Sequence, residues 1–135
     1  NWKENYRNPL GQAAEAYYGL TGIFPIMHVL GVRKELAEQH NFLPGALLKA
    51  FSDAKNLALD ALSDVSATKV TMPFVEESLT RARAQMGEDF WSYGFKPNAH
   101  VLDTFLDAHF RQGLSTRRLK PEDLFHPATL ESYAL

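Results

Sequence analysis

The apolar residues of the chain recur mainly at helical spacing. Between residues 42 and 62 they fall three or four positions apart, which places them along one face of a helix. The members of this stripe are Leu47, Ala50, Phe51, Ala54, Leu57, Ala58, Ala61 and Leu62. Pro44 is tolerated because it falls in the first turn, where its missing N–H is not needed. The pattern predicts one long helix over residues 43–62.

Four shorter helices are predicted from the same periodicity and from the residues at their ends. An Ala-rich segment closed by Gly19 predicts a helix at about 10–18, and residues 33–40 predict a short amphipathic helix. Two more lie between Pro73 and Gly87 and between Pro97 and Gly113, with proline at the start and glycine at the end. The tail after Lys120 holds two short pieces with enough apolar side chains to dock.

Residues 23–32 differ from the rest of the chain. Ile-Phe-Pro-Ile-Met-His-Val-Leu-Gly-Val is dense in β-branched and large apolar residues, a composition typical of a buried strand. Pro25 confines its first half to a sheet edge or to an irregular entry into the strand. A lone strand cannot satisfy its own backbone groups, so we expect it to pair with strands from outside this chain. The predicted fold class is therefore mainly α with a small β component.

Composition bounds the class of protein. The chain has 135 residues, a 45% hydrophobic share and a 22% charged share, which suit a single folded domain. The net charge of −2 offers no basic field, so nucleic acid is not an expected partner, and no apolar run is long enough to cross a membrane. Cysteine is absent, which excludes disulfides and thiolate chemistry. The chain begins without Met, so we expect its true amino terminus to lie elsewhere or to have been removed.

Several groups of side chains have both a functional and a structural interpretation. Trp91, Tyr93 and Phe95 in a glycine-containing loop either line a pocket or anchor the loop, and we favour the anchor. His100 and His109 lie nine residues apart, which is not a metal-ligand spacing, so no metal is expected.

The charged residues are interpreted as solvent-exposed. Glu76, Glu77, Arg81 and Arg83 form a solvated helix face, and the adjacent Arg117 and Arg118 are interpreted as exposed rather than as an anion site.

Specific motifs carry a family resemblance. The segments are Tyr-Tyr-Gly-Leu-Thr-Gly-Ile-Phe-Pro-Ile-Met-His at 17–28, Met-Gly-Glu-Asp-Phe-Trp-Ser-Tyr-Gly at 86–94, and Leu-Lys-Pro-Glu-Asp-Leu-Phe-His-Pro at 119–127. They resemble the 4,5-dihydroxyphthalate decarboxylases and related solute-binding-like proteins. The resemblance implies a two-lobed, type II periplasmic-binding fold with its ligand between the lobes. Residues 1–135 would be its carboxy-terminal part, with a crossing strand at about 23–32 and a helical cover over 33–135.

The resemblance also implies a reaction and a site. The complete protein would convert 4,5-dihydroxyphthalate, or a similar hydroxylated aromatic acid, to 3,4-dihydroxybenzoate and carbon dioxide without a cofactor. His28 is the candidate proton donor, the alternative being a histidine bound to a backbone carbonyl at a strand edge. Thr21, Tyr18 and Phe24 are candidate substrate contacts, although Phe24 also suits a core. Arginine or lysine for the carboxylates is expected from the absent portion.

Other interpretations remain open at this point. The same fold serves non-catalytic solute-binding proteins for small aromatic or heterocyclic acids, and a helical interaction domain is a third reading. If the complete protein is the enzyme, we expect a cytoplasmic location. If it is a solute-binding protein, we expect a periplasmic location. We expect association with the missing amino-terminal part or with further copies of the chain. Because half of the cleft would be missing, we expect the 135-residue chain alone to be inactive.

Overall fold

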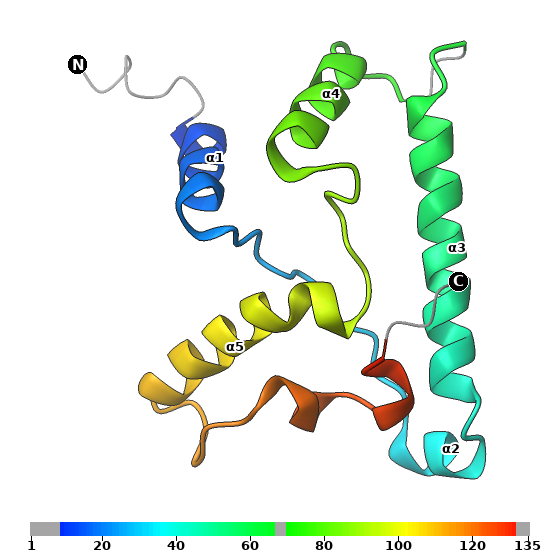
Figure 1. Cartoon of the computed structure of the whole chain (residues 1–135), viewed down its shortest axis with the longest axis vertical. Helices are drawn as coiled ribbons and strands as arrows, with labels where there is room; N and C mark the ends of the chain where they lie inside the picture. The colour runs from blue at the N-terminus through cyan, green and yellow to red at the C-terminus, as the bar shows by residue number, and fades with distance from the viewer. Residues whose placement is uncertain (1–8, 67–69, 132–135) are drawn as a thin grey trace.

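The computed structural model describes residues 9–66 and 70–131, and within these ranges it contains helices and no strand (Figure 1). The five α-helices are α1 (Pro9–Thr21), α2 (Lys34–Gln39), α3 (Leu43–Ser63), α4 (Val75–Met86) and α5 (Phe95–Arg111). Two 3-10 turns follow, η1 (Pro121–Leu124) and η2 (Pro127–Thr129). The prediction of a mainly helical chain is confirmed, and α3 matches the predicted long helix.

The first helix ends later than its composition suggested. Gly19 was expected to close it, but α1 continues to Thr21. The helix ends where Gly22 adopts a left-handed φ of 66°, a conformation that glycine enters without a Cβ clash. The Gly22 N–H then donates to the Tyr18 carbonyl at 2.7 Å, which satisfies one of the last carbonyls of the helix.

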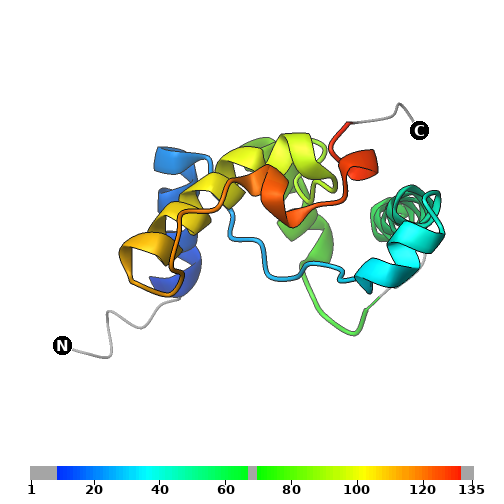
Figure 2. The ribbon, with the colours of Figure 1, turned by 90° about the horizontal axis from the view of Figure 1, so that it is seen from below.

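Residues 22–33 do not form the predicted strand. The segment runs irregularly from α1 to α2 (Figures 1 and 2). Backbone groups of residues 24–32 make no hydrogen bond to any described residue. A strand exists only where a neighbouring strand accepts and donates its backbone bonds, and the described part of the chain provides none. The expected β component is therefore absent here, and its pairing with other polypeptide remains a prediction.

The helices pack in an open arrangement (Figures 1 and 2). Helix α3 contacts α4 and η2, while α5 contacts η1. The buried hydrophobic residues of the described chain are few, namely Ile23, Ala37, Leu79, Leu102 and Leu106, and none of the described side chains falls below 2% exposure. The accessible surface is 10687 Å² at a mass of 15.2 kDa, whereas a compact monomer of this mass exposes about 7,100 Å².

Many large apolar side chains contribute to the exposed surface. Exposed side chains include Met27, Val29 and Leu30 in the irregular segment and Phe42, Leu57 and Phe105 on or beside the helices. Such an area is typical of a piece that buries its apolar faces against further polypeptide. No described helix combines the length and hydropathy required to span a bilayer.

Candidate functional site

The candidate substrate contacts at the end of α1 have local partners. The Thr21 hydroxyl donates to the Tyr17 carbonyl at 2.7 Å and accepts from the Ile23 N–H at 3.1 Å. The structure therefore uses this hydroxyl to terminate α1. Tyr18 is half-buried on the same turn. His100 Nε2 lies 3.3 Å from the Thr21 carbonyl oxygen, so α5 holds this helix end in place.

Phe24 and His28 lie in different surroundings although only four residues separate them. The half-buried Phe24 ring packs on Trp91, with the ring centroids 5.7 Å apart and the planes tilted by 58°. His28 is exposed, and its side chain makes no hydrogen bond or ion pair with a described residue. Neither the proton-donor role nor the strand-edge role predicted for His28 is tested by this arrangement.

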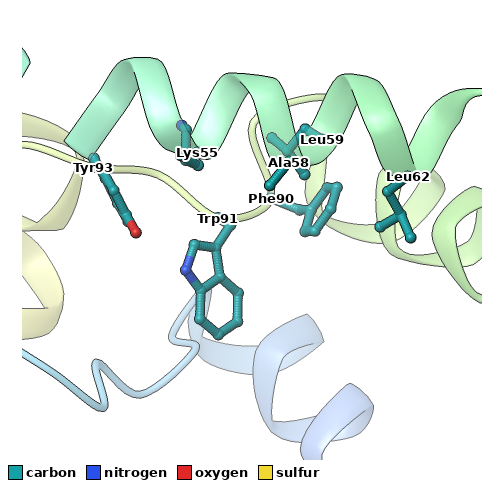
Figure 3. A pocket seen from close by; sticks show the side chains of 7 residues that line it. All are labelled: Lys55, Ala58, Leu59, Leu62, Phe90, Trp91 and Tyr93. Carbon is teal, nitrogen blue, oxygen red and sulfur yellow. The ribbon is translucent and has the colours of Figure 1, made fainter. Parts of the chain in front are cut away.

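Phe24 packs on Trp91, and Trp91 also lines a hollow of the structure. This hollow lies between α3 and residues 88–94, called here the aromatic loop, and has a volume of ≈ 280 Å³ (Figure 3). Its walls are mostly apolar. They are formed by Lys55, Ala58, Leu59, Leu62, Phe90, Trp91 and Tyr93.

Lys55 is the polar group of the hollow that sequence reasoning missed. Its side chain is 12% exposed, and its ammonium lies 2.7 Å from Asp89 Oδ1 and 5.2 Å from the centre of the Tyr93 ring. The sequence does carry a signal for this residue. Lys55 falls between Phe51, Ala58 and Leu62 at helical spacing, so a cation interrupts the apolar stripe of α3.

The first turn of α5 holds the aromatic loop. Asn98 Nδ2 donates to the Ser92 carbonyl at 3.0 Å and to the Gly94 carbonyl at 2.9 Å. Gly94 itself has a φ of 95°, which a residue with a Cβ adopts only under strain. Together these features turn the chain sharply into α5 and set the position of Trp91 and Tyr93 against α3.

The aromatic residues expected in this region therefore serve two purposes. Trp91 and Tyr93 line the hollow and are 44% and 39% exposed. Phe95 instead packs edge-on against Phe125 at 5.7 Å, which anchors the start of α5 to the tail. The predicted anchoring role suits Phe95, while the pocket role suits the other two.

The two adjacent arginines are both engaged in ion pairs. Arg118 Nη2 lies 2.8 Å from Asp103 and its Nε lies 3.4 Å from Asp107, and the Asp103 carboxylate is the main reason that the pKa of Arg118 is raised. Arg117 pairs with Asp123 at 3.3 Å. The pKa of Asp123 is lowered, chiefly because its carboxylate accepts the Lys120 backbone N–H and also because of Arg117. These pairs tie the tail to α5.

The predicted solvated face of α4 is only partly exposed. Arg83 donates to the Ser63 hydroxyl at 2.9 Å and lies 3.1 Å from Glu88, so it links α4 to α3 and to the aromatic loop. Glu76, Glu77 and Arg81 are exposed. Among the described residues no group of three or more carboxylate, imidazole or thiol side chains is arranged to hold a metal ion.

Comparison with known proteins bears directly on the resemblance. No family model matches the chain. The chain is 59% identical over 130 residues, or 96% of its length, to a protein of Comamonas testosteroni described as 4,5-dihydroxyphthalate decarboxylase. It spans 39% of the length of that relative. The resemblance predicted from the motifs is confirmed.

Proposed function

We propose that the chain is part of a decarboxylase acting on 4,5-dihydroxyphthalate or a similar hydroxylated aromatic acid. The observation that carries this proposal is the 59% identity over 130 residues to a decarboxylase of that name. Because the chain spans 39% of that relative, the activity is assigned to the complete protein and not to these residues alone. A cytoplasmic location accompanies this proposal.

The proposed reaction needs a proton donor and no oxidant. The hydroxyl group para to one carboxylate donates electron density into the ring, and the ring carbon bearing that carboxylate takes up a proton. The carbon–carbon bond then breaks, its electron pair restores the aromatic ring, and carbon dioxide leaves. The products are 3,4-dihydroxybenzoate and carbon dioxide, so no organic cofactor is required.

His28 is the proposed proton donor. An imidazole donates and accepts protons near neutral pH, and the exposed His28 ring has no described partner that competes for it. Tyr18 and Phe24 are proposed to contact the aromatic acid. Thr21 is a weaker candidate, because its hydroxyl already donates to the Tyr17 carbonyl.

The proposed fold of the complete protein is two-lobed, with residues 23–32 crossing between the lobes as a strand. Two observations support it. The backbone groups of 24–32 bond to no described residue, and the exposed surface exceeds that of a compact monomer by about 3,600 Å². Both are expected when the neighbouring strands and the rest of the lobes belong to other polypeptide.

The test is an assay of the purified complete protein with 4,5-dihydroxyphthalate. We expect one carbon dioxide released for each 3,4-dihydroxybenzoate formed, measured by trapped gas and by chromatography. Phthalate is the matched control, because without the para hydroxyl it lacks the electron donor and is not expected to react. Tight binding of 4,5-dihydroxyphthalate without turnover would instead identify a solute-binding protein and overturn the proposal.

A further inference from the structure

We propose that the hollow between α3 and the aromatic loop is a binding site for an aromatic carboxylate, with the Lys55 ammonium as the partner of the carboxylate. The inference extends the proposed function and rests on it for the identity of the natural ligand. It places a contact to a substrate carboxylate in this chain. The resemblance had implied that arginine or lysine from the absent portion would make such contacts.

The walls of the hollow suit a single aromatic ring. Its volume of ≈ 280 Å³ is near the lower end of the range for ligand pockets, about 300 Å³. Ala58, Leu59 and Leu62 of α3 form the apolar part of the lining, and the loop contributes the aromatic side chains Phe90, Trp91 and Tyr93. Figure 3 shows Lys55 emerging from α3 between the Trp91 and Tyr93 side chains. A ring placed here meets π faces and aliphatic carbons, while its carboxylate meets the ammonium.

The Lys55 ammonium has more hydrogen-bond donors than described partners. An ammonium group carries three donors, and one is directed at Asp89 at 2.7 Å. The Tyr93 ring 5.2 Å away accepts no classical hydrogen bond. Lys55 is 12% exposed whereas Asp89 is 59% exposed, so Asp89 can turn to solvent at little cost when another anion arrives. Among the described residues Asp89 is the one hydrogen-bond acceptor of Lys55, which leaves the other ammonium donors for a ligand in the hollow that Lys55 lines.

A purely structural role for the pair is the competing interpretation. The Lys55–Asp89 bridge would then only fasten the aromatic loop to α3, and another part of the complete protein would fill the hollow. The two interpretations differ in what Asp89 does. If the bridge only fastens the loop, Asp89 is required to hold the loop against α3. If Lys55 binds a ligand, Asp89 competes with the ligand carboxylate for the Lys55 ammonium.

The experiment measures the dissociation constant of phthalate, an unreactive dicarboxylate, by titration calorimetry on the complete protein. For Lys55→Met we expect weakening of about tenfold or more, the size of a lost hydrogen bond between charged groups. Lys55→Arg should recover most of the affinity. Lys49→Met is the matched control, because Lys49 lies on the same helix, is 56% exposed and also pairs with an aspartate, Asp53. It should leave the affinity unchanged.

Asp89→Asn provides a second measurement that does not depend on Lys55→Met folding. Removal of the competing carboxylate should tighten phthalate binding at the site. Unchanged affinity in both Lys55→Met and Asp89→Asn, or no binding of phthalate by the complete protein, would overturn the inference. If Asp89→Asn weakens binding as it lowers the unfolding temperature, the bridge is a fastener and the inference is also overturned.

The outcomes separate this inference from the proposed function. Binding of phthalate that depends on Lys55, without carbon dioxide release from 4,5-dihydroxyphthalate, would reject the decarboxylase and keep the site. Normal turnover with an unchanged KM in Lys55→Met would keep the decarboxylase and reject the site.

Discussion

Replacing Asn98 by aspartate is a sharp test of how the aromatic loop is held. The change keeps the shape of the side chain but replaces its NH₂ group, which donates at 3.0 Å to Ser92 and at 2.9 Å to Gly94, by an oxygen. Two hydrogen bonds worth about 1 kcal/mol each are lost, and a carboxylate is left facing two half-buried carbonyls. We therefore expect Asn98→Asp to lower the free energy of unfolding by about 2–3 kcal/mol near neutral pH.

The pH dependence distinguishes this cause from general damage. The neighbouring carbonyls disfavour the charged carboxylate, so its pKa should be higher in the folded state than in the unfolded state. The penalty should therefore shrink as the pH falls and the introduced carboxyl group becomes a donor. Urea unfolding of the complete protein at about pH 7 and about pH 4 measures how this penalty changes with pH.

Asn56→Asp on α3 is the control for that experiment. Asn56 is exposed and its side chain makes no hydrogen bond to a described residue, so the change should cost little at either pH. A loss for Asn98→Asp that equals the control, or that does not change with pH, would refute the reasoning about the loop.

Four further predictions concern other parts of the protein. In the complete protein, His28→Ala should reduce turnover about a hundredfold or more, and unchanged turnover with weaker binding would make His28 a contact only. The purified 135-residue chain should not decarboxylate 4,5-dihydroxyphthalate, so turnover near that of the complete protein would refute the need for a second lobe. In the complete protein, Leu106→Ala, at a side chain that is 4% exposed, should lower the free energy of unfolding measured with urea by about 2–5 kcal/mol, against much less for the neighbouring exposed and polar Thr104→Ala. NMR titration should place the pKa of Asp123 below the ordinary carboxyl value, and any stability from this charge should be lost as the pH falls through that lowered pKa.

The helices could be predicted because helix formation depends mainly on residues a few positions apart in the sequence. The stripe of α3 repeats for five turns, and its predicted bounds of 43–62 differ from the observed Leu43–Ser63 by one residue. The end of α1 was missed because both Gly19 and Gly22 are plausible stops, and the choice depends on backbone dihedral angles that composition does not show.

The absence of the strand and the presence of the hollow could not be predicted with the same success. Both depend on residues that lie far apart in the sequence or outside the chain. Residues 23–32 have strand composition, but a strand forms only against another strand. The ion pair of Lys55 was hidden for a related reason. Its carboxylate partner lies 34 residues further along the chain, so nothing near Lys55 in the sequence indicates an ion pair.

The sparse core has a calorimetric consequence for the isolated chain. The heat capacity of unfolding comes mainly from apolar surface that becomes exposed, and in this chain much of that surface already faces water. Its heat capacity increment should therefore be well below the usual value of about 12–15 cal/mol/K per residue. With few long-range contacts to lose together, melting should be broad and should absorb little heat. A scan of the 135-residue chain that lacks a sharp peak would thus reflect missing neighbours, even where each helix is intact.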